Sequence, residues 1–124
     1  MKNILKILLI DDEADICWLL EKALKDKGHK ITKTTTGKEG IVEAKRSTFA
    51  GAFIDIRLTD INGFEVARTI KKITPQTKVI MITGYTSDSN ELMKKHKGSY
   101  DDFISKPFDL TQIYATINEI VRRN

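Results

Sequence analysis

The sequence predicts an α/β fold in which a five-stranded parallel sheet is covered by helices on both faces. Short apolar runs and amphipathic helical patterns alternate along the whole chain and form five strand–helix units. The apolar runs are nearly continuous, which is typical of strands that are buried on both faces. Alternation of strand and helix favours a parallel sheet, because parallel neighbours need a crossover helix between them.

The first half of the chain contains two of these units. ILKILLI (residues 4–10) predicts a strand, and an apolar stripe over residues 16–24 predicts a helix that ends near Gly28. HKITKTT (residues 29–35) is more polar, so we expect this strand at an edge of the sheet. A second helix follows Gly37.

The second half of the chain continues the alternation. Its strands are predicted at residues 51–56, 78–83 and 102–106, and its helices at residues 66–73, 88–97 and 110–121. The helix at 88–97 is the weakest, because its only large apolar residues are Leu92 and Met93. We expect the segment 86–97 to be the most mobile helix, since little apolar area opposes its movement.

The composition indicates one globular domain over residues 1–124. Hydrophobic residues make up 40% of the chain and charged residues 31%, and no apolar run approaches the ~20 residues of a membrane-inserted helix. The apolar start is broken at Lys6 and runs into acids, which indicates a strand rather than a signal peptide. The single Cys17 cannot form an internal disulfide, which fits the cytoplasm. The net charge of +4 is scattered, so direct nucleic acid binding is not expected.

Polar side chains gather where the predicted strands end. Asp11 and Asp12 follow the first strand, and Asp55 lies near the end of the third. Thr83 ends the fourth strand and Lys106 ends the fifth. The carboxyl ends of parallel strands share one rim of the sheet, where open α/β sheets bind their ligands. We therefore expect these side chains to form one site.

The chemistry of this set points to phosphoryl transfer. Three carboxylates would repel one another unless a cation lies among them. Oxygen ligands select a hard ion, and Mg²⁺ is the usual choice where phosphate is also handled. Lys106 adds a positive charge and Thr83 a hydroxyl donor, which together predict a cradle for a phosphoryl group on a carboxylate. Asp55 is the predicted nucleophile.

Four motifs, in the order LLIDDE, IDIRLTDINGFE, MITGYT and FISKPF, carry a resemblance to a known family. The chain resembles the receiver domain of two-component response regulators, including the single-domain chemotaxis and sporulation-relay types. The resemblance covers nearly the whole chain. It implies a flavodoxin-like, doubly wound (βα)5 fold with strand order 2-1-3-4-5. It also implies a phosphoacceptor of a phosphorelay that assists its own phosphorylation and dephosphorylation but is not an enzyme.

The resemblance implies a role for each residue of the acidic group. Asp55 matches the phosphoacceptor, which becomes an aspartyl phosphate. Asp12 matches the direct ligand of Mg²⁺ or Mn²⁺, and Asp11 holds metal-bound water. The backbone carbonyl of Arg57 matches the third protein ligand.

Three further positions match the family. Thr83 and Lys106 match the pair that contacts the phosphoryl group. Phe103 matches the aromatic switch position, where the family commonly has Tyr. Because Phe has no hydroxyl to satisfy, we expect its inward rotamer to be populated even before phosphorylation. The Lys106–Pro107 bond is typically cis in the family.

The resemblance also implies partners. The phosphoryl donor is a sensor histidine kinase or a histidine phosphotransfer protein. A downstream protein or a second copy would bind the face formed by residues 86–97, 102–106 and 110–121. Lys94, Lys95 and Lys97 would give this face a basic rim that favours an acidic partner.

The sequence departs from the family pattern in the loops. Thr59 stands where the family usually has Pro, and Ser99 and Tyr100 stand where it usually has Gly-Ala. The segment between Thr83 and Lys106 is one residue longer than in typical members. The surface around the fourth helix and fifth strand is therefore expected to be unusual.

Other functions fit the same residues less well. A haloacid-dehalogenase-like phosphatase would carry a second acid two residues after Asp55, but that position is Arg57. A phosphate-independent adaptor would have lost one of the site residues, and none is lost. No G-x-G-x-x-G follows the first strand, which disfavours dinucleotide binding. The chain is either a stand-alone relay protein or a domain of a longer regulator.

Three aromatic side chains are expected to have structural rather than functional roles. His29 and His96 show no metal-ligand spacing, so we expect them at the surface or at a sheet edge. Trp18 falls outside the apolar stripe of the first helix, and we expect it to be half-buried against a neighbouring side chain.

Overall fold

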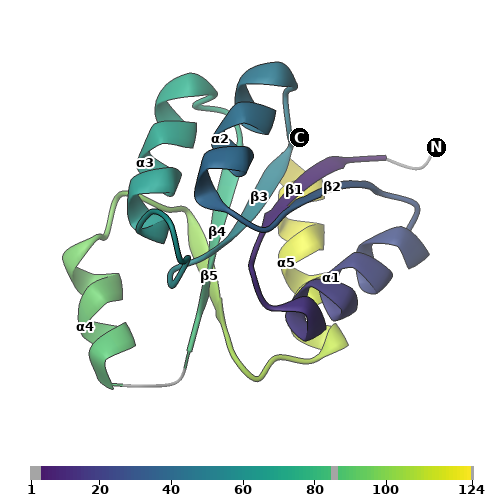
Figure 1. Ribbon diagram of the computed structural model, residues 1–124. Helices are drawn as coiled ribbons and strands as arrows, with labels where there is room; N and C mark the ends of the chain where they lie inside the picture. Colours follow the sequence, from purple (N-terminus) through teal and green to yellow (C-terminus); the bar gives the residue numbers. More distant parts are fainter. Residues whose placement is uncertain (1–3, 85–86, 124) are drawn as a thin grey trace.

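The computed structural model describes residues 4–84 and 87–123, and it gives no side-chain placement for residues 14–17, 87–89 and 123. Cys17 is in that second group, and Thr86 lies outside the described residues. The described residues form five strands and five helices in strict alternation (Figure 1). In chain order these are β1 (Lys6–Ile10), α1 (Ala14–Asp26), β2 (Lys30–Thr34), α2 (Gly37–Arg46), β3 (Gly51–Asp55), α3 (Gly63–Ile73), β4 (Lys78–Thr83), α4 (Ser87–Lys95), β5 (Asp102–Ser105) and α5 (Leu110–Arg123).

The strands form one sheet in the order β2-β1-β3-β4-β5, and every pair is parallel. Both the predicted fold class and the predicted strand order are confirmed. The polar strand β2 lies at an edge, as expected. Ile10 pairs with Ile54 and Asp55 pairs with Ile82, so the carboxyl ends of the three central strands are nearly level.

The hydrophobic core consists of two layers, one on each face of the sheet. Successive residues of a strand point to opposite faces. Ile7, Leu9 and Phe53 pack against α1 and α5 on one face. Leu8 and Ile54 pack against α2, α3 and α4 on the other. Figure 1 shows the two sets of helices on either side of the sheet. This double burial explains why the strand sequences are nearly continuous apolar runs.

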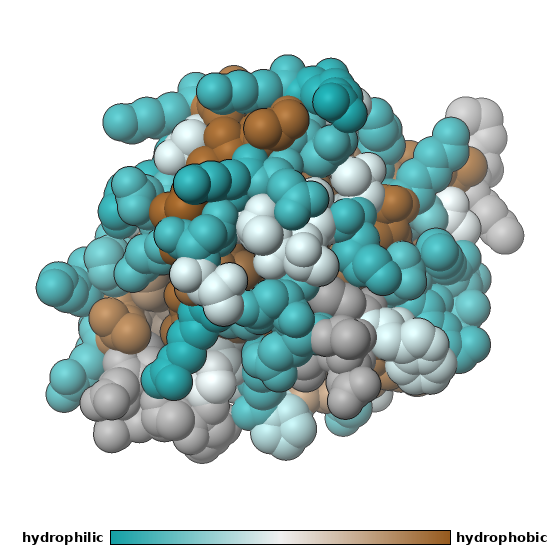
Figure 2. Space-filling view, in the orientation of Figure 1, coloured by the Kyte–Doolittle hydropathy of each residue, from teal (hydrophilic) through white to brown (hydrophobic). Residues whose placement is uncertain are grey.

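The surface drawn in Figure 2 is mainly hydrophilic, with hydrophobic residues in small separate groups. Trp18 on α1 is 61% exposed, so the expectation that it is half-buried is wrong. Charged side chains line the open depression around it, namely Glu21, Lys22, Lys25 and Asp26. Leu20, Ala23 and Leu24 of α1 pack into the core, whereas the side chains that line the depression with Trp18 are charged. Within residues 4–84 and 87–123, no helix combines the length and the apolar character needed to cross a membrane.

Gly63 holds the loop after β3 close to the end of the strand. It is the first residue of α3, and Asn62 caps this helix by accepting a hydrogen bond from the Phe64 N–H at 2.8 Å. A Cβ at position 63 would collide with the carbonyl oxygen of Asp55 and lie 2.7 Å from the Cα of Ile56. The absence of a side chain at Gly63 therefore allows α3 to start against the backbone that carries Asp55.

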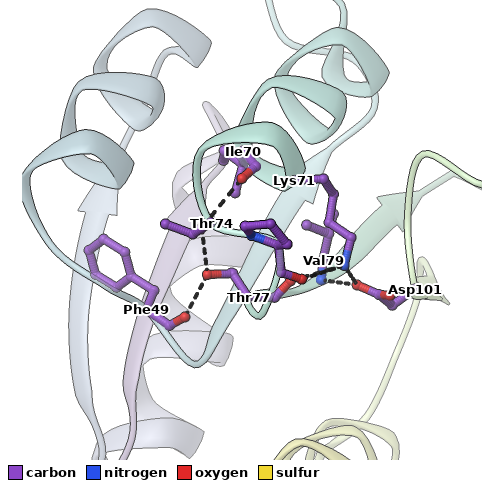
Figure 3. Close-up of polar contacts among 8 residues, drawn as sticks. Phe49, Ile70, Lys71, Thr74, Thr77, Val79 and Asp101 are labelled. Carbon is purple, nitrogen blue, oxygen red and sulfur yellow. Dashed lines mark hydrogen bonds and ion pairs between the residues drawn. The ribbon is translucent and has the colours of Figure 1, made fainter.

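A polar network fixes the opposite rim of the sheet, where β4 and β5 begin (Figure 3). The Thr77 hydroxyl donates to the Phe49 carbonyl at 2.7 Å, across to the segment that precedes β3. Lys71 at the end of α3 forms an ion pair with Asp101 at 2.6 Å. Asp101 also accepts a hydrogen bond from the Val79 N–H at 2.7 Å. These contacts join α3 to the starts of β4 and β5.

His29 directly precedes the edge strand β2, which agrees with an edge position, but it is buried and therefore not a surface residue. Its residue exposure is 8%, and its ring Nδ1 accepts a hydrogen bond from the Leu5 N–H at 3.1 Å. The reason is the left-handed turn at Gly28, whose φ is +85°, which directs the chain from α1 back under β1. His96 is half-buried and stacks on Phe64, with the ring centroids 4.2 Å apart.

We expect the contribution of His29 to the free energy of unfolding to fall as the pH drops below about 6.5. Burial lowers the pKa of the His29 imidazole below its ordinary value of 6.5, so protonation favours the unfolded state, where the ring titrates normally. Protonation also removes the acceptor of the Leu5 hydrogen bond, which is worth about 1 kcal/mol. Denaturant unfolding of the wild type and of His29→Gln between about pH 7 and pH 5 measures this contribution as the difference between the two proteins, because the raised pKa of Asp11 and the lowered pKa of His96 are common to both. The His29→Gln variant keeps an acceptor but no titrating ring, and an equal loss in that variant would contradict this assignment.

Candidate functional site

The polar residues at the carboxyl ends of the strands lie on one rim of the sheet. Asp11 and Asp12 come directly after β1, and Asp55 is the last residue of β3. Thr83 is the last residue of β4, and Lys106 follows β5. Because β1, β3, β4 and β5 are neighbours in this order, the sheet brings all of these residues to the same rim.

The three aspartates form a compact acidic cluster. Asp11, Asp12 and Asp55 each offer a carboxylate oxygen, and these atoms all lie within 4.8 Å of one another. Asp11 and Asp55 are buried, whereas Asp12 is exposed. Backbone N–H groups orient the buried pair: Glu13 donates to Asp11 Oδ1 at 2.8 Å, and Arg57 donates to Asp55 Oδ1 at 3.0 Å.

The electrostatics of the cluster favour a cation. Burial raises the pKa of the Asp11 carboxyl to about 7, and repulsion by Asp55 adds to this shift while the Glu13 N–H opposes it. A site that holds its carboxylates at such an energetic cost is stabilised by a positive charge placed among them. The donors are all oxygen atoms, which suits a hard divalent ion such as Mg²⁺. The acidic cluster therefore fits the metal that the sequence predicts.

Lys106 is the cation that this chain itself supplies. Its Nζ lies 3.4 Å from Asp55 Oδ2 and 2.6 Å from Glu13 Oε1. Burial alone lowers the pKa of the Lys106 ammonium, but the hydrogen bond to Glu13 and the attraction of Asp55 and Asp11 outweigh it and raise the pKa. The backbone N–H of Lys106 donates a hydrogen bond to the Thr83 carbonyl at 2.7 Å. The Lys106–Pro107 peptide bond is cis, as the resemblance implies.

Thr83 is the last residue of β4, next to β3, and Phe103 lies on β5, one strand farther from Asp55. Thr83 is 3% exposed, and its hydroxyl donates to the carbonyl of its neighbour Gly84 at 3.1 Å. Phe103 on β5 is 47% exposed and meets Tyr100 edge-on, with ring centroids 6.4 Å apart. The structure therefore holds the outward conformer of Phe103, and the population of its inward rotamer stays a prediction.

Two backbone neighbours complete the site. Arg57 lies just after β3, where its N–H binds Asp55, and the use of its carbonyl as a metal ligand stays a prediction. The sequence pattern predicts no role for Glu13, although its carboxylate lies closer to the Lys106 ammonium than that of Asp55 does. The third acid of LLIDDE was the available signal, because a residue at this position starts α1 on the same rim.

Comparison with known proteins identifies the family. Residues 7–118 match the response regulator receiver domain, and the chain belongs to this family. The cell cycle transcriptional regulator CtrA of Caulobacter vibrioides is 29% identical over 120 residues, which cover 97% of this chain and 52% of CtrA. The transcriptional regulatory protein YkoG of Bacillus subtilis is 30% identical over 118 residues, which cover 95% of this chain and 51% of YkoG. The chain thus spans about half the length of these curated relatives.

Solved structures share the fold over almost the whole chain. A CheY-like receiver domain protein from Methanospirillum hungatei JF-1 is 27% identical with a TM-score of 0.86, and the match covers 98% of this chain and 97% of that one. A two-component response regulator from Clostridium difficile is 28% identical with a TM-score of 0.85, and the match covers 96% and 97%. Receiver domains are signalling domains rather than classical enzymes, bind Mg²⁺ at an acidic pocket, and interact with histidine kinases or phosphotransfer proteins.

Proposed function

We propose that residues 1–124 form a receiver domain in which Asp55 accepts a phosphoryl group from a phospho-histidine donor. An Asp55 carboxylate oxygen attacks the phosphorus atom, a P–O bond forms, and the P–N bond to the donor imidazole breaks. The imidazole leaves with the electron pair of that bond and takes a proton from water. Asp55 then carries an acyl phosphate.

A single observation carries this proposal: Asp55 is a buried carboxylate at a strand end, with the Lys106 ammonium 3.4 Å away and two further aspartates beside it. A buried acid with no chemical task is normally paired closely or replaced by an apolar residue. Here the acid is held near a cation at the rim where ligands bind. Lys106 is placed to donate a hydrogen bond to an oxygen of the transferring group and so stabilise its charge.

The acidic cluster is the proposed metal site. Asp12, Asp55 and the Arg57 carbonyl would hold Mg²⁺ or Mn²⁺ directly, with Asp11 binding through water. When bound, the metal shields the charge of the nucleophile from the phosphoryl oxygens. The burial of Asp11 supports this assignment, because burial raises its pKa, with the Asp55 charge adding to the shift, and a cation would offset both effects.

The readout is proposed to pass through Thr83 and Phe103. The Thr83 hydroxyl, which donates to Gly84 at 3.1 Å, would turn to a phosphoryl oxygen on Asp55. Phe103 would then fill the vacated space, and the face of α4, β5 and α5 would change for a downstream protein or a second copy. We place this activity in the cytoplasm, with a sensor histidine kinase or phosphotransfer protein as the donor.

Phosphorylation of the wild-type protein by a small acyl phosphate tests the proposal. With Mg²⁺ present, acetyl phosphate should add one phosphoryl group that is labile to alkali, as acyl phosphates are. Reduction of the intact adduct with borohydride and peptide mapping by mass spectrometry should place it on Asp55. Chelation of the metal should stop the reaction, because the cluster then lacks its counter-charge.

Asp12→Ala provides the matched test of the metal site. This side chain is exposed, so its loss should leave the fold intact while it slows labelling by at least about tenfold. The wild-type protein should also melt at a higher temperature with Mg²⁺, and the shift should shrink in Asp12→Ala. A stable adduct on another residue, or labelling that is indifferent to chelation, would refute the proposed function.

A further inference from the structure

The shortest contact of Lys106 is made with Glu13 and not with the proposed nucleophile. The Lys106 Nζ to Glu13 Oε1 distance is 2.6 Å, which is a strong charge-assisted hydrogen bond, whereas Asp55 Oδ2 lies at 3.4 Å. The side chain of Glu13 is 57% exposed and that of Asp55 is 4% exposed. The ammonium is therefore drawn from the buried carboxylate toward the solvent side of the site.

The Glu13 carboxylate has no capping task that explains its place. Glu13 is the N-cap residue of α1, but its side chain makes no capping hydrogen bond. An acid at a helix N-terminus is common, and such an acid normally interacts with the free N–H groups of the first turn. Here the carboxylate instead reaches across to Lys106, which is 93 residues away in the chain. This long-range contact is a feature of the phosphoryl site rather than of the helix.

We infer that Glu13 is a positioning residue that competes with the phosphoryl group for Lys106. The inference rests on the proposed function of Asp55. Before phosphorylation, Glu13 holds the ammonium away from Asp55. When a phosphoryl group arrives, Lys106 exchanges its hydrogen bond to Glu13 for one to a phosphoryl oxygen, and no proton is transferred. The released Glu13 is solvated at once because it is largely exposed, so the exchange is reversible.

The competition sets the rate of phosphorylation in this chain. A complex in which the Lys106 ammonium moves inward to the transferring group loses its short contact with Glu13. The same contact re-forms when the phosphoryl group leaves, which favours the unphosphorylated state. Glu13 therefore acts as a brake on Asp55 through Lys106, and removal of its charge should accelerate phosphorylation and strengthen the binding of a phosphoryl mimic.

The Glu13→Gln variant tests this inference. Loss of an ion pair that is partly exposed to solvent changes a rate or equilibrium constant by up to about fivefold. Acetyl phosphate should therefore label Glu13→Gln about two to five times faster than the wild type. The affinity for beryllofluoride in the presence of Mg²⁺ should rise by a similar factor. Glu43→Gln is the matched control, since Glu43 is paired with Arg46 at 3.2 Å on α2 and should leave both values unchanged.

A second background separates action through Lys106 from simple repulsion of an anionic donor. In the Lys106→Ala background, Glu13→Gln should no longer change the labelling rate or the mimic affinity. An acceleration that persists there, or no acceleration in the single variant, would overturn the inference. The side-chain ammonium resonance of Lys106 in the unphosphorylated protein provides an independent readout by NMR. This resonance should shift in Glu13→Gln and not in Glu43→Gln. An unshifted resonance in Glu13→Gln overturns the inference even if Asp55 is never labelled. Failure of labelling alone counts against the proposed function.

Discussion

The Asp55→Asn variant is expected to take up no phosphoryl group from acetyl phosphate or from a phospho-histidine donor. The amide nitrogen and oxygen of Asn are poor nucleophiles, and Asp55 is the aspartate whose carboxylate lies 3.4 Å from the Lys106 ammonium. The loss should be complete within the sensitivity of intact-mass measurement. Labelling retained in Asp55→Asn, with Asp11 and Asp12 unchanged, would mean that another carboxylate is the acceptor.

The same variant should fold at least as well as the wild type, which makes the result interpretable. Asn retains an oxygen that can accept the hydrogen bond from the Arg57 N–H, at 3.0 Å in the wild type. It also removes the negative charge that repels Asp11 inside the cluster. Circular dichroism and thermal melting check this point. Asp102→Asn, an exposed aspartate at the start of β5, is the control and should be labelled at the wild-type rate.

The sheet and its strand ends were predictable because they depend on features that a sequence carries directly. Ile7–Ile10 and Ala52–Ile54 are buried on both faces, so their near-continuous apolar runs identify central parallel strands. Once strands alternate with helices, the residues that follow them must share one rim. Asp55 could therefore be assigned to the same site as Lys106, although 51 residues separate them in the chain.

The misassigned and overlooked side chains depend on how individual groups pack, which periodicity does not report. The burial of His29 follows from the turn at Gly28, which directs the ring under Leu5. Trp18 is exposed, and the side chains that line the depression with it are charged. The role of Glu13 depends on the reach of two long side chains, and no spacing rule relates it to Lys106.

The second large effect is expected on α4 when beryllofluoride and Mg²⁺ occupy the site. Leu92 and Met93 are its only large apolar residues, and of these Met93 is buried and Leu92 only partly so. Near the carboxyl end of α4, the Tyr100 hydroxyl donates a hydrogen bond to the Met93 carbonyl at 2.8 Å. Tyr100 also meets Phe103 edge-on, with the rings nearly perpendicular at 87°. Movement of Phe103 should therefore change the environment of the carboxyl end of α4 through Tyr100.

The chemical shifts of backbone amides are the measurement. Adding the mimic should change them at Phe103 and Tyr100 and along residues 87–97, well beyond the residues that touch it. A weakly packed helix shifts readily because few apolar contacts oppose the change. The amides of α1 beyond its first turn, which pack through Leu20 and Leu24 into the core, should change least and act as the internal control.

Tyr100→Phe separates the hydroxyl bond from the ring contact. It keeps the aromatic edge that Phe103 meets but removes the hydrogen bond to Met93, which is worth about 1 kcal/mol. Hydrogen exchange at the carboxyl end of α4 should then become about fivefold faster in the free protein, and the response of this end to the mimic should shrink. Shift changes confined to residues that contact the mimic in the wild type, with none at Phe103 or along α4, would refute the switch and leave a domain that only carries the phosphoryl group.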